Sequence, residues 1–179
     1  DGCGMLYAGP LYVPCVSENL IKFIKHSYPK IREQVPGAQL TLLGKNPIKA
    51  LRKLIAEDRS IHHVDFVDDY EEFMNRDWVY IHPQHGAAGY KTKIQQVMAL
   101  GLPVVGTEYA FTGLDMLPGE HCYLCKTDDE FIENVIRLLR DKALRSRIGI
   151  ASAQRIRNRH SIERIGEEMI DVYRGIAGR

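Results

Sequence analysis

Short apolar runs alternate with longer amphipathic stretches along the chain, and several of the runs end at glycine or proline. Six runs have the length of buried strands: residues 5–8, 39–43, 61–66, 78–82, 103–106 and 122–125. Most of these runs are apolar throughout rather than alternating. They therefore indicate strands covered on both faces, as in a parallel sheet.

The stretches between the runs carry apolar residues at helical spacing. The first helix is expected to follow Ser17 as its N-cap and to break or restart at Pro29. Further helices are expected at residues 48–57, 69–76, 91–100, from Thr127 onward, 143–159 and 161–176. Two of them open with capping-box patterns, Asp69-x-x-Glu72 and Thr127-x-x-Glu130.

Strands and helices in this order predict an α/β, Rossmann-like fold. It would have three layers, α/β/α, around a parallel sheet of about six strands, with the C-terminal helices packing outside. We expect one domain over residues 1–179. The sequence begins with Asp1 rather than methionine, from which we expect either a segment of a longer protein or a chain processed at its start.

The chain has 24 lysines and arginines against 23 acidic residues. This balance excludes the strongly basic surface that gathers nucleic acid or anionic lipid, so no nucleic-acid partner is expected. No apolar run approaches the roughly 20 residues of a transmembrane helix, so no transmembrane segment is expected.

Four scattered cysteines are typical of a reducing cytosol rather than of a disulfide framework. Cys122 and Cys125 lack the second pair that a zinc ribbon needs, and residues three apart on a strand point to opposite faces. We therefore expect packing thiols. His62 and His63 would also face opposite sides of a strand, and no metal site is expected.

Ligands of open parallel sheets bind beyond the carboxyl ends of the strands. The loops at those ends follow Ala8, Leu43, Phe66, His82 and Val105. Three of these loops open with glycine: Gly9, Gly44 and Gly106. A flavodoxin-like receiver would need an acidic residue at a strand end, and these strand ends exclude it.

The loop after His82 is rich in glycine and runs into a helix that carries Lys91, Lys93 and Gln96. Free backbone N–H groups at a helix N-terminus form a seat for phosphate, to which the lysines would add charge. Lys93 and Gln96 share a helix face, so one could reach a diphosphate and the other a ribose hydroxyl. The alternative is a tight packing turn followed by solvated lysines.

Residues 86–107 read GAAGYKTKIQQVMALGLPVVGT, and this run resembles the signature of the group 1 glycosyltransferases, the glycogen-synthase-like retaining family. Further segments resemble the same family in the same order: 29–32 (PKIR), 35–44 (VPGAQLTLLG), 66–69 (FVDD), 112–115 (TGLD) and 138–145 (LLRDKALR). The resemblance covers nearly the whole chain, from Met5 to about Ile176.

The resemblance implies the C-terminal, nucleotide-sugar-binding domain of a GT-B enzyme, with its N-terminal acceptor domain absent from this sequence. It implies nucleotide-sugar contacts at Gly9, Gly44, Lys45, Phe66, Val67, His85, Gly86, Gly89, Lys93 and Gln96. The base would lie near Gly44, Lys45 and the Phe66-Val67 turn, the diphosphate at the glycine loop with Lys93, and the ribose at Gln96.

The partners that this family implies are a nucleotide-diphosphate sugar as donor and a glycan or lipid as acceptor, without a cofactor or a metal. Such a hexosyltransferase-like enzyme of polysaccharide biosynthesis would be cytoplasmic. Peripheral attachment to the inner membrane face would come through the absent domain, and the isolated domain would be inactive.

Three positions depart from the family pattern. Gln96 stands where the ribose-binding glutamate is usual, Ala88 stands eight positions earlier in place of a second glutamate, and Pro10 replaces an arginine. They motivate an alternative function, a degenerate, non-catalytic domain used for interaction or scaffolding. No catalytic residue is identified beyond the candidate His85, which could contact phosphate or sugar as a hydrogen-bond donor or proton shuttle. His82 is expected to point into the sheet.

Overall fold

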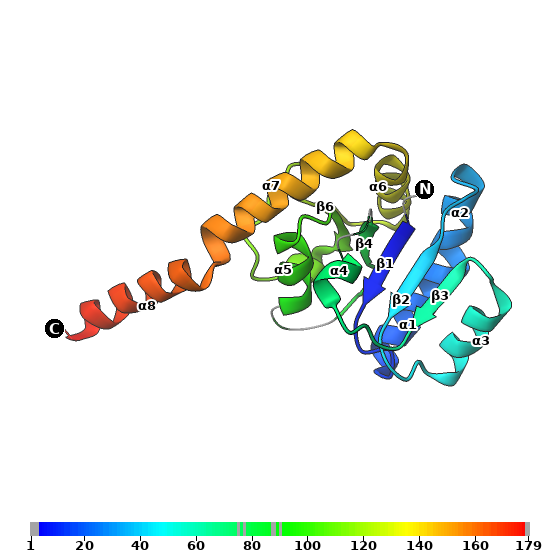
Figure 1. The fold of residues 1–179 in the computed structure, drawn as a ribbon, viewed down its shortest axis with the longest axis horizontal. Helices are drawn as coiled ribbons and strands as arrows, with labels where there is room; N and C mark the ends of the chain where they lie inside the picture. Colours follow the sequence, from blue (N-terminus) through cyan, green and yellow to red (C-terminus); the bar gives the residue numbers. More distant parts are fainter. Residues whose placement is uncertain (1–3, 75, 77, 87–88, 90, 178–179) are drawn as a thin grey trace.

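The protein is an α/β domain with one six-stranded parallel sheet in the order β3-β2-β1-β4-β5-β6 (Figure 1). It is seen in a computed structural model that describes residues 4–74, 76, 78–86, 89 and 91–177. The strands are β1 Gly4–Ala8, β2 Leu40–Leu43, β3 Ile61–Val64, β4 Trp78–His82, β5 Val104–Thr107 and β6 Tyr123–Cys125. All six predicted runs form strands, which confirms the predicted fold class.

The sheet has its switch point between β1 and β4, where the strand order reverses. These two strands pair in register from Gly4 and Trp78 to Leu6 and Tyr80. Beyond that point the Tyr80 hydroxyl donates to the Ala8 carbonyl at 2.9 Å. The Tyr80 side chain thus replaces the backbone hydrogen bonds that would pair β1 with β4 further along. Beyond this point the two strands lead into separate loops.

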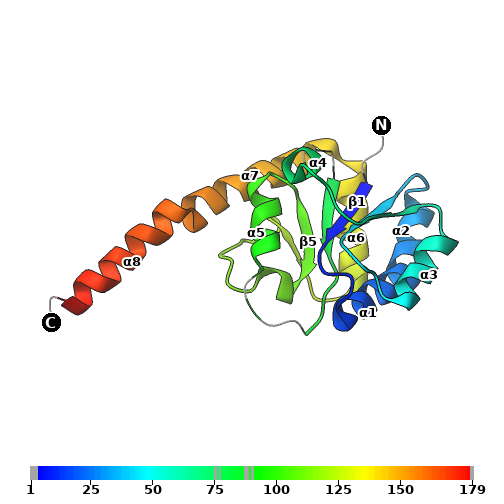
Figure 2. The ribbon, with the colours of Figure 1, turned by 60° about the horizontal axis from the view of Figure 1, so that its bottom comes forward.

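The helices form two layers, one on each face of the sheet (Figure 2). On one face lie α1 Pro14–Lys22, the π-helix η1 Phe23–Ser27, α2 Tyr28–Gln34, α3 Lys49–Glu57 and α6 Asp128–Arg140. On the other lie α4 Tyr70–Met74, α5 Thr92–Ala99 and the 3-10 helix η2 Glu108–Phe111. Each layer buries its own apolar cluster, so the sheet is covered on both faces.

Cys125 at the end of β6 and Cys122 just before the strand point to opposite faces of the sheet, as their spacing predicts. Cys122 belongs to the cluster under α4 and α5, whereas Cys125 belongs to the cluster under α1 and α6. Burial raises the pKa of the Cys122 thiol to about 12 and that of Cys125 to about 11. Both behave as the packing thiols that the spacing predicts.

The first helix begins earlier than expected. Pro14 starts α1 and Val13 is its N-cap, so the prediction of Ser17 as N-cap is wrong. Proline is favoured in the first helical turn, and the Ser17 hydroxyl instead donates to the Leu11 carbonyl, which fixes the loop after β1. The expected restart at Pro29 occurs through the π-helical turn of η1, and Pro29 lies in the first turn of α2.

Both predicted capping patterns supply caps. The Glu72 N–H donates to Asp69 Oδ1 at 2.8 Å, and the Glu130 N–H donates to Thr127 Oγ1 at 3.2 Å. In the second pattern Glu130 Oε2 also accepts from the N–H of Lys126 at 2.7 Å. The helices α4 and α6 therefore begin where the sequence predicts.

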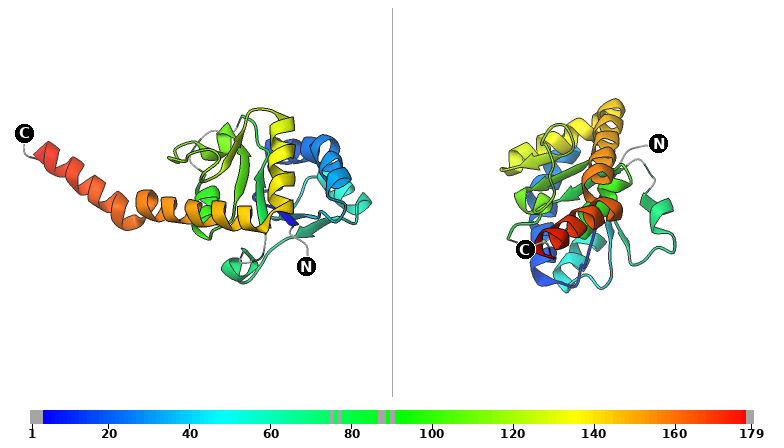
Figure 3. Two further views of the ribbon diagram at one scale, coloured as in Figure 1. Left: turned by 90° about the horizontal axis from the view of Figure 1, so that it is seen from above. Right: turned by 90° about the vertical axis from the view of Figure 1, so that its left-hand side faces the viewer.

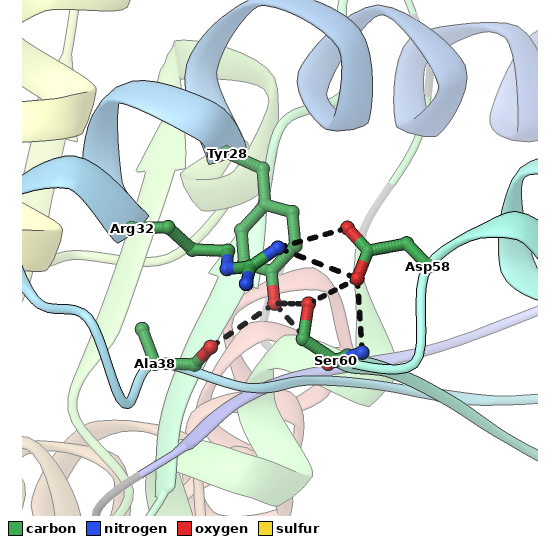
Figure 4. Close-up of polar contacts among 5 residues, drawn as sticks. All are labelled: Tyr28, Arg32, Ala38, Asp58 and Ser60. Carbon is green, nitrogen blue, oxygen red and sulfur yellow. Dashed lines mark hydrogen bonds and ion pairs between the residues drawn. The ribbon is translucent and has the colours of Figure 1, made fainter.

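A polar cluster fastens α2 to the loops before β2 and β3 (Figure 4). The Tyr28 hydroxyl donates to Ser60 Oγ at 2.8 Å and lies 3.1 Å from the Ala38 carbonyl oxygen, while Arg32 donates to the Asp58 carboxylate at 3.1 Å. Burial raises the pKa of Asp58, but hydrogen bonds from Ser60 and from Arg32 outweigh it and lower that pKa. This cluster lies at the amino ends of the strands and stabilises the edge opposite the ligand-binding loops.

The last two helices differ in their packing (Figure 3). Helix α7, Lys142–His160, lies against α5 and α6, with Gly149 directly over the Gly101 carbonyl. Helix α8, Ile162–Ala177, extends away from the body, and none of its described residues is buried. Its exposed apolar side chains are Ile162, Ile165, Met169, Ile170, Val172, Tyr173 and Ile176. The expected packing outside the sheet is thus seen for α7, whereas α8 projects from the domain.

Candidate functional site

A cleft of about 530 Å³ opens at the carboxyl ends of β1, β2 and β3, and we call it the β1–β3 cleft. Its lining residues are Ala8, Gly9, Pro10, Leu43, Gly44, Lys45, Asp65, Phe66, Val67, Asp68, Tyr70 and Lys93. Six of the residues predicted to contact a nucleotide sugar are in this set: Gly9, Gly44, Lys45, Phe66, Val67 and Lys93. The fold therefore gathers these residues, far apart in sequence, at one edge of the sheet.

Two glycines allow the loops after β1 and β2 to meet at the floor of the cleft. The Gly9 N–H donates to the Leu43 carbonyl at 2.9 Å, and a Cβ atom on Gly44 would collide with the Gly9 carbonyl. A Cβ atom on Gly9 would come within 2.6 Å of the Tyr7 hydroxyl. A side chain at Gly44 would separate the two loops, and one at Gly9 would displace the buried Tyr7 ring, so both positions need glycine for space.

Lys93 enters the cleft from the first turn of α5. Its ammonium group lies 4.7 Å from the centre of the Tyr70 ring, and burial lowers the pKa of Lys93. The Tyr70 hydroxyl is buried without a hydrogen-bond partner among the described residues, and burial raises the pKa of Tyr70 to about 12. A half-buried cation thus lies over a neutral tyrosine ring, and the ammonium group could bond an oxygen of a ligand in the cleft.

Lys45 and Phe66 form the outer wall of the cleft. The Lys45 ammonium group lies 5.1 Å from the centre of the Phe66 ring, whose residue is 65% exposed. An exposed aromatic ring at the mouth of a cleft offers a flat apolar face for a planar ligand group. Next to it, Asp65 and Asp68 add carboxylates that can accept hydrogen bonds from hydroxyl or amino groups.

The glycine-rich loop leads from β4 to α5 beside the cleft. Gly86 and Gly89 have φ values of 74° and 89°, and added Cβ atoms at these two positions would meet no atom within 4 Å. Backbone conformation rather than space therefore requires glycine here. Lys91 donates to the Gly89 carbonyl at 3.0 Å, and Ala88, named above as a departure from the family pattern, lies outside the described residues.

A family model for the glycosyl transferases group 1 matches residues 3–141 of this chain, well over half of its length. The chain belongs to the group 1 glycosyltransferases. Trehalose synthase from Pyrococcus horikoshii is 21% identical over 166 residues, which cover 84% of this chain and 40% of that protein. The chain thus spans less than half the length of this curated relative.

Solved structures support the same fold for this glycosyltransferase chain. A variant of TarM from S. aureus, solved with fondaparinux, alpha-GlcNAc-glycerol and UDP, has a TM-score of 0.80 at 14% identity. The match covers 96% of this chain and 35% of that chain. The C-terminal domain of LpcC, a group 1 family protein from Francisella tularensis, has a TM-score of 0.69 at 16% identity, and 89% and 87% of the two chains are covered.

Four residues of the predicted contact set do not line the β1–β3 cleft of this glycosyltransferase domain. Gly86 and Gly89 belong to the neighbouring loop, and Gln96 is exposed on α5, one turn beyond Lys93. His85 is exposed in a second cavity of about 400 Å³, between α1 and α6. Contacts of these residues with a nucleotide sugar stay predictions.

Two further sequence expectations have clear outcomes. His82 is only 8% exposed and its ring stacks on Tyr7 with centroids 6.0 Å apart, so it is buried as expected. Gly106 does not open a loop, because β5 continues to Thr107. A Cβ atom on Gly106 would come within 2.5 Å of the Ala110 Cβ atom, so this glycine lets η2 pack on the strand.

The expectations from sequence missed Tyr70, which follows the capping residue Asp69 and lies below Lys93 in the cleft. Its place after a helix cap at the end of the β3 loop is a signal that could have marked it. Within the described residues, no group of three or more potential metal ligands is found. Among the same residues no helix has the length and apolar character of a membrane span.

Proposed function

We propose that this chain is the donor-binding half of a retaining, two-domain glycosyltransferase and that the β1–β3 cleft holds a nucleotide-diphosphate sugar. The proposal rests on three features that meet in one cleft: the glycine backbone of the loops after β1 and β2, the half-buried Lys93, and the exposed ring of Phe66. Its place at the carboxyl ends of the strands beside the switch point supports the same function.

Each part of such a donor finds matching chemistry. The base would stack on or beside Phe66, and its polar edge would bond backbone groups at Gly44 and Val67. The diphosphate would bond the Lys93 ammonium group, and the ribose would bond Gln96.

The reaction makes a nucleotide diphosphate the leaving group, and negative charge grows on its phosphate oxygens in the transition state. Lys93 is the cation of the cleft that would stabilise this charge. Pro10 supplies none, so Lys45 and Lys91 are the further cations that could compensate. The proposal involves no metal and no cofactor.

The rest of the enzyme would supply the acceptor. The matched regions cover only 40% of the trehalose synthase and 35% of the TarM chain, and TarM was solved with fondaparinux, alpha-GlcNAc-glycerol and UDP. We infer that a separate domain brings the glycan or lipid acceptor to the cleft and that the chain of 179 residues binds donor without transfer.

Calorimetric titration of the chain with UDP and with GDP tests the proposal. We expect saturable binding of one nucleotide, weakened about tenfold or more by Lys93→Ala because a charge-assisted hydrogen bond is worth about 1.5–3 kcal/mol. Lys142→Ala, a change of an exposed lysine at the start of α7, is the matched control and should leave affinity unchanged. Absence of binding for both nucleotides at millimolar concentration would favour the degenerate, non-catalytic alternative.

A further inference from the structure

The second cavity lies at the same edge of the sheet as the β1–β3 cleft but over the other half of the strand order. It has a volume of about 400 Å³, within the range of about 300–1,000 Å³ typical of small-molecule sites. Its walls come from α1 and η1, from the loop after β4, and from the segment between β6 and α6. We call it the α1–α6 cavity.

The floor of the cavity is aromatic. Phe23 and Phe131 both line it and meet edge to face, with ring centroids 5.7 Å apart and an interplanar angle of 65°. Both rings are nearly fully buried, so their positions are held by the core. The small part of each ring that borders the cavity gives it an apolar floor, beside which the C–H groups of a sugar ring can lie.

The rim of the cavity is polar and carries more positive than negative charge. Lys22 from α1 and Lys126 after β6 contribute ammonium groups, against the single carboxylate of Asp128. Among the described residues neither lysine forms an ion pair. His26 and His85 add imidazole groups that can donate to or accept from hydroxyl groups.

The walls are held in place by hydrogen bonds between elements. Gln84 is only 2% exposed, and its Nε2 atom donates to the Val16 carbonyl of α1 at 3.3 Å. Asn19 lies between the same helix and the loop, with its Nδ2 atom 3.4 Å from Gln84 Oε1 and 3.5 Å from the His85 carbonyl oxygen. The Thr107 hydroxyl donates to the Gln84 carbonyl and ties the loop to β5. The cavity is therefore preformed, which lowers the entropic cost of binding.

We propose that the α1–α6 cavity binds an anionic saccharide, a sugar that carries a phosphate or a carboxylate group. The C–H groups of the sugar ring lie beside the apolar floor that Phe23 and Phe131 form. The hydroxyl groups bond Asp128 and the imidazoles, and the anion pairs with Lys22 and Lys126. The inference rests on the proposed function, since a glycosyltransferase handles two saccharides. The anionic sugar is either a unit of the acceptor or the glycosyl group of the donor.

Nuclear magnetic resonance titration of the chain with glucose 1-phosphate tests this inference, with glucose as the neutral comparison. We expect saturable shifts of the backbone amides that border the cavity, those of Asn19, Lys22 and Thr127, with glucose binding at least tenfold more weakly. Lys22→Gln and Lys126→Gln should each weaken glucose 1-phosphate about fivefold, the effect of one partly exposed ion pair of about 1 kcal/mol. Lys25→Gln is the matched control, an exposed lysine three residues further on that does not line the cavity.

Several results would overturn the inference: no saturable shift, equal affinity for glucose, an equal effect of Lys25→Gln, or shifts confined to the β1–β3 cleft. A parallel titration with UDP separates this inference from the proposed function, because UDP should shift Gly44 and Lys93 whether or not the second cavity is a site. UDP-glucuronic acid then identifies the source of the sugar. Shifts in both cavities at one Kd indicate the donor, whereas glucose 1-phosphate binding beside saturating UDP-glucuronic acid indicates the acceptor.

Discussion

The buried imidazole of His82 makes the stability of the domain depend on pH. Burial, together with the nearby positive charge of Lys91, lowers the pKa of His82 from its ordinary value of 6.5 to about 4. In the unfolded chain the same imidazole titrates at about 6.5. Between these two values the unfolded state binds a proton that the folded state does not, so the free energy of unfolding falls as the pH is lowered.

The size of the effect follows from the two pKa values. The loss due to His82 is about 0.2 kcal/mol at pH 7, about 1.4 kcal/mol at pH 5.5 and about 2.5 kcal/mol at pH 4.5. Below about pH 4 the folded state also binds the proton and the loss levels off. Because a small domain is stable by only about 5–15 kcal/mol, a loss of this size is measurable.

Urea-induced unfolding of wild type and of His82→Phe at these three pH values isolates the contribution of His82 to the loss of unfolding free energy. Phenylalanine keeps the stacking on Tyr7 and removes two buried ring nitrogens that have no hydrogen-bond partner among the described residues. We expect the variant to lose about 2 kcal/mol less than wild type between pH 7 and pH 4.5. His62→Gln, a change of an exposed histidine, should behave as wild type. Equal losses in wild type and His82→Phe would refute the reasoning.

Three further predictions concern the packing of the C-terminal helices. Gly149→Ala brings a methyl group into the Gly101 carbonyl and should cost about 1–3 kcal/mol in thermal unfolding, whereas Gly166→Ala, in open space on α8, should leave the melting of the body unchanged. Arg145→Met removes bonds of 2.7 and 3.1 Å to the Leu138 and Leu139 carbonyls at the end of α6 and should cost about 1–3 kcal/mol in urea unfolding. Thr127→Ala removes the N-cap of α6, and calorimetry should show a loss of about 1 kcal/mol.

The layout of the sheet could be predicted from the sequence because local and tertiary signals agree. A strand such as β4 is covered on both faces, so its residues from Trp78 to Ile81 are hydrophobic and the strand stands out from the flanking polar loops. The caps at Asp69 and Thr127 form within a single helical turn and depend on no distant residue. Parallel pairing then leaves few arrangements for such a β-α series.

Features that depend on contacts between distant segments could not be predicted. Ser17 has the chemistry of an N-cap, but Pro14 starts the helix and the hydroxyl bonds Leu11. His85 directly precedes Gly86 of the glycine-rich loop, yet it lines the α1–α6 cavity rather than the β1–β3 cleft. Tyr70 reaches the β1–β3 cleft through its contact with Lys93, a residue more than twenty positions away. The spacing of these residues along the chain does not reveal the contacts, although the helix cap at Asp69 marks the position next to Tyr70.

Helix α8 buries none of its described residues, and this divides the chain into parts of unequal stability. A 16-residue helix without tertiary packing is close to the limit at which a helix persists in water. Its stability comes from its own backbone and from local pairs such as Arg164 and Glu168, 3.1 Å apart. Amide hydrogens of α8 should therefore exchange with solvent far faster than those of α5, and its melting is a separate, less cooperative event that precedes unfolding of the sheet.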